Sequence, residues 1–284
     1  MDELFSLSGR VALVTGGTRG VGKMIAAGFA ERGARVYITG RSLDTALETA
    51  KALSENGADC LALELEVTDP TSRLRLTQEL KDREGRLDLL VNNAAVGSRA
   101  SFDCLTEEIW DHDMETNVKA PFFLTQSLAG LLRTSVVQSG RSAKVINIAS
   151  IDGLGLNVGE TIAYQVSKAA LIHLTRCLAG RLVKENILIT AIAPGAFASD
   201  LNIAARDRPD DFGRLVPVGR IGSPEDIAGA AIFLASRAGD YVVGDTLIVD
   251  GGFICARPTH GPLPAPSAKL VTSAEAPVFA AYQI

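Results

Sequence analysis

The sequence predicts an α/β fold in which a parallel sheet of about seven strands is doubly wound, with helices on both faces. Apolar stretches of strand length alternate with helical patterns from the start of the chain to about residue 250. These stretches are apolar throughout rather than at every second position, which is typical of strands covered on both faces. A glycine-rich loop also separates the first strand from the first helix, as doubly wound folds require.

The expected elements follow one another in regular alternation. Strands are predicted at residues 10–15, 35–39, 60–67, 87–91, 144–150, 187–193 and 246–250. Helices are predicted at residues 21–32, 45–55, 70–84, 122–133, 163–184 and 224–236. Asp69-Pro70 and Ser223-Pro224 mark two helix starts, because a capping side chain precedes a proline whose missing N–H costs nothing in the first turn. Right-handed crossovers between these units give the doubly wound arrangement.

One domain accounts for most of the chain. A length of 284 residues fits a single α/β domain with an appended tail better than two domains. We expect the domain to span residues 1–254. Residues 255–284 concentrate Pro, Ala and Ser without periodicity, which predicts a tail that is disordered or lies on a neighbouring subunit.

Charge and composition exclude several classes of function. The net charge of −5 gives no basis for binding nucleic acid or an anionic membrane. No apolar run approaches the roughly 20 residues that span a bilayer. The N-terminus carries acidic residues where a secretory signal carries basic ones, so we expect a soluble cytoplasmic protein. The four cysteines and three histidines are scattered without metal-ligand spacing, and no metal site is predicted.

A phosphate-binding loop is predicted after the first strand, where the run TGGTRGVG at residues 15–22 opens a helix. Glycines let the backbone approach a pyrophosphate, and the helix N-terminus offers free N–H groups and the positive end of its dipole. The spacing T-G-x-x-x-G-x-G differs from the usual G-x-G-x-x-G, and loops are glycine-rich for other reasons as well. The position of this loop in an α/β chain favours nucleotide binding. The predicted contacts are Gly16, Thr18, Arg19, Gly20, Val21 and Gly22.

Two arginines discriminate between the dinucleotides. Arg41 follows the second strand, where an acidic residue would bind the ribose 2′-OH of NADH. Its planar guanidinium suits the 2′-phosphate of NADPH instead. Arg19 can flank the same phosphate from within the glycine-rich loop. Two surface arginines without a ligand are the alternative, and we predict NADPH as the cofactor.

Tyr164 and Lys168 are the candidate proton-transfer pair. Their i, i+4 spacing places both side chains on one face of the predicted helix. A phenol with a pKa of about 10 exchanges protons inefficiently near neutrality, and a nearby ammonium lowers that pKa. The spacing alone is common in helices, where a half-exposed polar pair is the alternative. Ser150 favours the catalytic interpretation, because it ends a predicted strand at the edge where such folds bind ligands.

Further polar residues are expected at the same edge of the sheet. Asn92 and Asn93 end the fourth predicted strand, and Ala193-Pro194-Gly195 ends the sixth. Asn117 lies early in another helical stretch. Because the carboxyl ends of parallel strands meet at one edge, these residues are predicted to share a crevice with Ser150.

Over residues 7–253 the chain resembles the short-chain dehydrogenase/reductase family. The resemblance rests on TGGTRGVG, NNAA, Asn117, Ser150, YQVSK, PGAFAS and VDGGF. It implies a Rossmann-type fold in which Tyr164 protonates the substrate carbonyl oxygen, Lys168 lowers the tyrosine pKa and holds the nicotinamide ribose, and Ser150 hydrogen-bonds the carbonyl. It also implies that Asn117 positions a water toward Lys168. The additional cofactor contacts that it implies are Glu66, Val67, Asn93, Ala94, Phe197 and Ser199.

Within this family the chain is most similar to β-ketoacyl reductases, especially those of the rhamnolipid-biosynthesis type. The FSLSGRVALVTGG opening and the spacing from Ser150 to Tyr164 carry this similarity. It implies NADPH-dependent reduction of a β-ketoacyl thioester, or of a related fatty-acid or polyketide intermediate. Another alcohol or ketone, such as a sterol, a sugar or a cyclic ketone, uses the same machinery and remains open. A non-catalytic NADP-binding scaffold would need a damaged site, and all four catalytic residue types are present.

Two positions depart from the family pattern: Ala95 stands where a glycine is usual, and Glu66 replaces the usual aspartate or asparagine. Family members are usually tetramers or dimers. The predicted helix at residues 163–184 is apolar on more than one face, as a helix packed on both the sheet and a neighbour would be. A homo-tetramer or homodimer is therefore expected.

The substrate side is expected to be covered by residues 198–218, a segment that behaves as a lid in this family. Its arginines could attract an anionic carrier, but the aspartates among them favour a mixed solvated face. The arginines are Arg206, Arg208 and Arg214. An apolar wall beside the nicotinamide, or simple loop packing, is expected from Ile151, Leu154, Leu156 and Val158.

Overall fold

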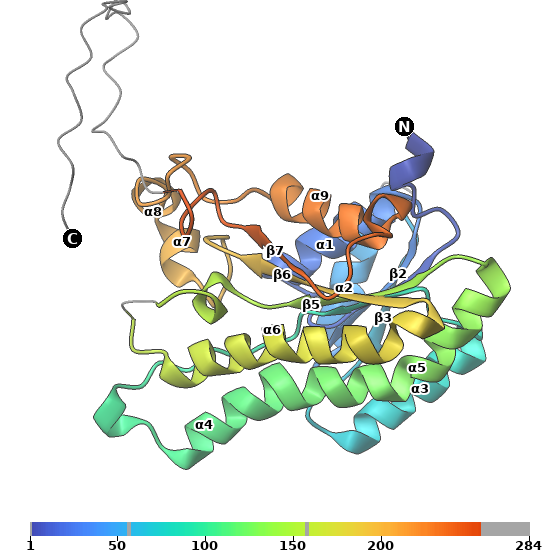
Figure 1. Ribbon diagram of the computed structural model, residues 1–284, viewed down its shortest axis with the longest axis horizontal. Helices are drawn as coiled ribbons and strands as arrows, with labels where there is room; N and C mark the ends of the chain where they lie inside the picture. The colour runs from blue at the N-terminus through green and yellow to red at the C-terminus, as the bar shows by residue number, and fades with distance from the viewer. Residues whose placement is uncertain (1, 56–57, 157–158, 257–284) are drawn as a thin grey trace, which may run out of the picture.

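A seven-stranded parallel sheet forms the centre of the molecule, in the order β3-β2-β1-β4-β5-β6-β7 (Figure 1). The computed structural model describes residues 2–55, 58–156 and 159–256. Most of the predicted tail and Val158 therefore lie outside the described residues. The strand order reverses direction between β1 and β4, where a doubly wound fold opens its ligand crevice. The predicted fold class is confirmed.

The strands are close to the predicted ones, with two corrections at their ends. Their bounds are β1 (Val11–Val14), β2 (Arg35–Gly40), β3 (Cys60–Glu64), β4 (Leu89–Asn92), β5 (Ala143–Ile148), β6 (Ile187–Pro194) and β7 (Thr246–Val249). The prediction carried the third strand to residue 67 and the fifth to residue 150. Ser150 instead follows β5 and accepts a hydrogen bond from the Asp152 backbone N–H at 3.1 Å, which starts a 3-10 turn, η4 (Ile151–Gly153).

Helices cover both faces of the sheet. The main ones are α1 (Gly20–Glu31), α2 (Leu43–Ser54), α3 (Pro70–Glu84), α4 (Glu107–Met114), α5 (Ala120–Ser139), α6 (Ile162–Leu182) and α9 (Pro224–Ala235). Two short helices, α7 (Ile203–Asp207) and α8 (Pro209–Gly213), lie between β6 and α9. Figure 1 shows α1 and α9 on one side of the sheet and α3, α5 and α6 on the other. Among the described residues, no helix is long and apolar enough to cross a membrane.

Successive residues of a strand pack alternately into two separate hydrophobic cores, one on each face of the sheet. Ala12 and Val14 of β1 belong to the core beneath α1 and α9, where Phe29 and Ile227 are fully buried. The intervening residues of β1 belong to the other core, beneath α3, α5 and α6. Because a strand directs successive side chains to opposite faces, a sheet covered on both sides needs apolar residues at every position. This requirement explains the continuous apolar runs from which the fold was predicted.

The predicted helix caps are correct. The Asp69 carboxylate accepts hydrogen bonds from the Thr71 and Ser72 N–H groups at 2.9 and 3.1 Å. At the start of α9, the Ser223 and Asp226 side chains form a reciprocal capping box. Such caps satisfy first-turn donors that no helical carbonyl can reach.

The first half of a long helical segment was not predicted from the sequence. Helix α4 leads directly into a π-helical turn, η3 (Glu115–Lys119), and then into α5. The prediction began this helix at residue 122, after Pro121. A proline usually marks a first turn, but here the π turn precedes it and the helical path continues. The π turn matters for the site, because Asn117 lies at its centre.

Buried polar side chains connect the sheet to α5 and α6. Asn92 on β4 donates from Nδ2 to Asn147 Oδ1 on β5 at 2.8 Å and to Thr125 Oγ1 at 3.2 Å. Asn147 in turn donates from Nδ2 to Thr175 Oγ1 on α6 at 2.9 Å. The expectation that Asn92 lies beside the cofactor crevice is therefore wrong. Its side chain is buried between strand and helix, and serves this polar chain.

Candidate active site

The glycine-rich loop leaves β1 and enters α1 with the geometry of an anion-binding turn. Gly16 and Gly20 have positive φ angles of 61° and 52°, which favour glycine. A Cβ at Gly22 would overlap the Asn93 side chain. Arg19, at the N-cap of α1, provides no side-chain cap. The first N–H groups of α1 therefore have no capping side chain, and they suit a phosphate.

Asn93 and Thr15 fix this loop to the end of β4. The Asn93 Nδ2 donates to the Thr15 carbonyl at 2.8 Å and to the Gly16 carbonyl at 3.1 Å. The Thr15 hydroxyl accepts from the Asn93 and Ala94 N–H groups at 2.9 and 3.0 Å. The predicted contacts Asn93 and Ala94 therefore lie directly beside the loop. The Asn93 amide is used to hold the loop in shape.

Other predicted cofactor residues lie at the ends of β2 and β3. Arg41 is exposed beyond β2, and Thr18 packs against Gly40 at that strand end. Glu66 and Val67 follow β3, but the Glu66 carboxylate is occupied by the Thr68 hydroxyl at 2.9 Å. This contact is local, because the longer glutamate side chain folds back onto its own turn.

Ser199, one of the two residues predicted after β6, also reaches the loop. Ser199 lies against Gly20, where an added Cβ would be 3.2 Å from the Ser199 Cβ. Arg19 forms an ion pair with Asp200, Nη1 to Oδ2, at 2.9 Å. The Phe197 ring is buried and packs against Gly222 in the core. The predicted phosphate loop and the segment expected to cover the substrate side are therefore in direct contact.

The arginines of this covering segment do not form a uniformly basic surface. Arg206 on α7 forms ion pairs with Asp200 at 2.6 Å and with Asp207 at 2.8 Å. Arg214 lies 3.6 Å from Asp211. These ion pairs are exposed and mixed in sign, which agrees with the solvated-face interpretation.

Ser150, Tyr164 and Lys168 converge where β5 meets α6. Lys168, in the second turn of α6, is buried and donates from Nζ to the Ile148 carbonyl at 2.9 Å. Its Nζ lies 5.6 Å from the centre of the Tyr164 ring. A side-chain hydrogen bond joins Tyr164 to Ser150. The three predicted catalytic side chains are thus brought together by one strand end and the first turns of one helix.

Burial governs the pKa values of this pair. Burial raises the pKa of Tyr164 to about 12, and the hydrogen bond with Ser150 acts in the lowering direction. Burial lowers the pKa of Lys168 to about 8, against a smaller raising effect of Asp113. The expectation that Lys168 brings the tyrosine pKa down is not met here, because desolvation of the phenolate dominates. At neutral pH Tyr164 is a protonated phenol.

Asn117 joins the site through the π turn. Its Nδ2 donates to the Val96 carbonyl at 2.9 Å and to the Ser167 Oγ at 3.0 Å. Its Oδ1 accepts from the Val96 N–H at 3.0 Å. Asn117 therefore connects the loop after β4 to α6, one residue before Lys168. Asn117 was predicted as a site residue. Ser167, which lies within the YQVSK motif, was not.

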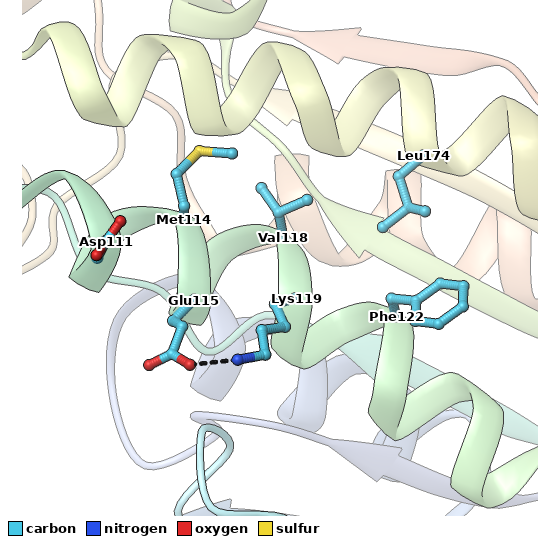
Figure 2. Close-up of a pocket in the computed structure, with 7 residues that line it drawn as sticks. All are labelled: Asp111, Met114, Glu115, Val118, Lys119, Phe122 and Leu174. Carbon is cyan, nitrogen blue, oxygen red and sulfur yellow. Dashed lines mark hydrogen bonds and ion pairs between the residues drawn. The ribbon is translucent and has the colours of Figure 1, made fainter.

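A hollow in the surface lies away from this constellation. It is a groove of about 670 Å³ on the outer surface of α4, η3, α5 and α6 (Figure 2). Met114, Val118, Phe122 and Leu174 provide its apolar lining, and an ion pair between Glu115 and Lys119 runs along it. No predicted site residue lines the groove.

Comparison with known proteins decides the family. The model of a family described as enoyl-(acyl carrier protein) reductase matches residues 16–254. The rhamnolipids biosynthesis 3-oxoacyl-[acyl-carrier-protein] reductase of Pseudomonas aeruginosa is 41% identical over 256 residues, which cover 89% of this chain and 99% of that protein. The chain belongs to the short-chain dehydrogenase/reductase family. It is therefore an oxidoreductase, and the resemblance drawn from the sequence motifs is confirmed.

Solved structures of other short-chain dehydrogenase/reductases agree with this assignment. The Pseudomonas aeruginosa RhlG/NADP active-site complex superposes with a TM-score of 0.84 at 41% identity, covering 89% of this chain and 99% of RhlG. Other relatives act on different substrates: the sorbitol dehydrogenase of Cereibacter sphaeroides is 38% identical over 87% of this chain and 98% of its own length. Membership of the family therefore establishes the reaction class and leaves the substrate open.

Proposed function

We propose that this short-chain dehydrogenase/reductase is an NADPH-dependent reductase of β-ketoacyl thioesters or related fatty-acid or polyketide intermediates. The observation that carries the proposal is the convergence of Ser150, Tyr164 and Lys168 where β5 meets α6. When bound, NADPH supplies the hydride that adds to the carbonyl carbon. The protein orients the ketone and supplies the proton that completes the alcohol. Because NADPH is an intracellular reductant, we place the enzyme in the cytoplasm.

Tyr164 is suited to act as the general acid. With a pKa of about 12, its phenol is fully protonated at neutral pH and can donate to a carbonyl oxygen that is gaining charge. Ser150 holds the same oxygen with its hydroxyl, and the two groups together stabilise the developing oxyanion. Lys168 then stabilises the phenolate left on Tyr164, because its ammonium lies near the ring and is largely protonated below pH 8.

The cofactor preference rests on Arg41 and Arg19. Arg41 follows β2 and is exposed, and Arg19 lies at the N-cap position of α1. A 2′-phosphate placed between the two guanidinium groups gains charge-assisted hydrogen bonds that NADH cannot make. The NADP complex of RhlG supports this choice. Binding would draw Arg19 away from Asp200, so Arg41 is expected to carry the larger share of the preference.

Arg41→Asp is expected to invert this preference. The change removes a phosphate-binding cation and adds a carboxylate that can accept hydrogen bonds from a ribose 2′-OH while repelling a 2′-phosphate. KM for NADPH should rise by about 10- to 100-fold, since a charge-assisted hydrogen bond contributes about 1.5–3 kcal/mol. Steady-state kinetics with NADPH and NADH provide the measurement. Arg75→Asp, on the exposed side of α3, is the matched control, and an equal loss in that variant would contradict the assignment.

Apolar side chains around the site favour an acyl substrate over a sugar. Leu154 follows Ser150, and Leu201 lies near Gly97 in the loop that touches the Tyr164 ring. Leu201 and Ile203 are about half exposed, at 49% and 51%. Exposed leucine and isoleucine can pack against an alkyl chain, whereas a sugar needs hydrogen-bonding groups. Leu154 and Leu156 are exposed, which favours the apolar-wall interpretation of this loop over packing into the core.

Oxidation of a polyol is the second candidate, supported by the 38% identity to sorbitol dehydrogenase. A panel assay separates the two functions. NADPH oxidation is measured with β-ketoacyl thioesters, simple β-ketoesters and cyclic ketones, and NADP⁺ reduction is measured with sugar alcohols. The proposal expects the highest kcat/KM for the thioesters. Turnover of sugar alcohols alone would contradict the acyl assignment and retain the Tyr164 chemistry.

We further propose that a second copy of the chain packs on the groove of Figure 2, giving the expected homodimer or homo-tetramer. Leu174 is a partly buried apolar residue in the middle of α6, and it lines the groove together with Met114, Val118 and Phe122. Leu174→Arg places a charge in this contact and is expected to lower the mass measured by light scattering by half or more. Val137→Arg, at the exposed end of α5, is the control, and dissociation by both variants would argue against the groove.

A further inference from the structure

Asp113 is a fully buried carboxylate beside the catalytic pair that the mechanism above does not use. It lies on α4 with 0% of its surface exposed. Both of its oxygens accept hydrogen bonds from Ser98, Oδ1 from the hydroxyl at 2.8 Å and Oδ2 from the backbone N–H at 3.3 Å. A buried carboxylate is costly to desolvate, and two neutral donors compensate that cost only in part. This uncompensated cost indicates that the carboxylate has a role at this position.

Asp113 and Asn117 hold the two sides of one short segment. Asn117, four residues further along, bonds both backbone groups of Val96, while Asp113 bonds Ser98. Between them lies Gly97, and a Cβ placed there would be 3.3 Å from Cδ2 of the Tyr164 ring. The helix thus clamps residues 96–98 with Gly97 close to the ring of the general acid.

Among the described residues, two carboxylates act on the pair, and helix α4, which carries Asp113, packs directly against α6, which carries Tyr164 and Lys168. Asp113 acts on both Tyr164 and Lys168, and raises the pKa of each. Asp152, on η4, acts in the same direction on Tyr164. Burial of the Lys168 ammonium favours its neutral form, which could not stabilise a phenolate on Tyr164. A buried negative charge nearby opposes that loss.

We propose that Asp113 is a positioning residue of this reductase, which holds residues 96–98 against Tyr164 and keeps the Lys168 ammonium charged. The catalytic part of the inference rests on the proposed function. The electrostatic part concerns the folded protein alone, so the two can be tested apart.

A double-mutant cycle in stability tests the electrostatic part without any substrate. The variants are Asp113→Asn, Lys168→Met and the double variant, compared by chemical unfolding at pH 7. Asn keeps the shape of Asp113 and removes its charge. If Asp113 compensates the buried ammonium, Lys168→Met should raise the unfolding midpoint more in the Asp113→Asn background than in the wild type. Equal shifts in both backgrounds would overturn the proposal.

The pH dependence of turnover tests the same charge in the working enzyme. Asp113→Asn is expected to move the alkaline limb of kcat/KM for ketone reduction down by about 0.5–1 pH unit, because an opposite charge has been removed. Glu108→Gln, on the exposed face of the same helix, should leave the limb in place. A uniform loss at every pH in Asp113→Asn, without displacement of the limb, would show a merely structural residue and overturn the proposal.

Ser98→Ala tests whether the Asp113–Ser98 contact holds residues 96–98 in place. It also serves as the second variant if Asp113→Asn does not fold, because it disturbs the fold least. It removes the hydroxyl donor and keeps the charge, so the alkaline limb should stay in place while kcat falls on the order of tenfold through misplacement of Tyr164. An unchanged kcat would overturn the clamp. Any ketone or alcohol that the enzyme turns over can serve in these assays. Absence of turnover with every substrate of the panel would contradict the proposed function, and the stability cycle would still decide the role of Asp113.

Discussion

Replacing Tyr164 by phenylalanine is expected to lower kcat for ketone reduction by about 10³-fold. The substitution removes only the hydroxyl, and with it both the proton donor and one of two hydrogen bonds to the developing oxyanion. General acid catalysis contributes about 10²- to 10⁴-fold, and a lost oxyanion donor adds to the effect. Stopped-flow or steady-state measurement of NADPH oxidation gives the rate.

Two controls keep this result interpretable. The dissociation constant for NADPH should stay close to that of the wild type, because the phosphate loop and Arg41 are untouched. Ser150→Ala should fall between the wild type and Tyr164→Phe, since it removes a hydrogen bond and leaves the proton donor in place. Full activity of Tyr164→Phe would exclude the proposed general acid, and would revive the interpretation of the chain as a non-catalytic NADP-binding scaffold.

Lys168→Met is expected to abolish most of the activity and to make the protein more stable. The pKa of Lys168 falls from 10.5 to about 8 on folding. Because one pKa unit corresponds to about 1.4 kcal/mol, burial of this ammonium costs about 3 kcal/mol at pH 7. Methionine fills similar space without charge, but it leaves the Ile148 carbonyl without its donor, at a cost of about 1 kcal/mol. The free energy of unfolding should therefore rise by about 2 kcal/mol.

The pH dependence of this gain gives it a distinct signature. Below pH 8 the lysine is protonated in both the folded and the unfolded state, so the penalty is complete. Between pH 8 and 10.5 the folded state has released the proton and the unfolded state has not, so the wild type becomes more stable relative to the variant. The advantage of Lys168→Met should thus shrink across this range in urea unfolding. A gain that is constant with pH would contradict the assigned pKa.

The fold was predictable because each strand is apolar on both faces. The runs that became β1, β4 and β6 could be recognised without ambiguity, since both cores draw on them. The caps at Asp69 and Ser223 were predictable for a similar reason: a local side chain satisfies local donors. Helix α4 was not predictable from periodicity, because the run EEIWDHDM is mostly polar and its buried member is the charged Asp113.

The proximity of three candidate catalytic residues was predicted from the sequence, and their electrostatics were not. Motifs placed Ser150, Tyr164 and Lys168 in one crevice, and the structure brings them together. The direction of the tyrosine pKa was wrong, because spacing along a helix reveals a neighbouring charge but not the depth of burial. Asp113 and Ser98 were also missed, since their contact joins a loop to a helix 15 residues further along the chain.

The buried chain of amides and hydroxyls from Asn92 through Asn147 to Thr175 sets a limit on how this enzyme can change. Apolar surfaces slide past one another at little cost, whereas the hydrogen bond from Asn147 to Thr175 is satisfied at only one axial position of α6. Tyr164 and Lys168 travel with that helix. Leucines in place of the polar chain could leave the free energy of unfolding unchanged and let α6 shift along its axis. The stability of the protein and the alignment of its catalytic residues would then vary independently.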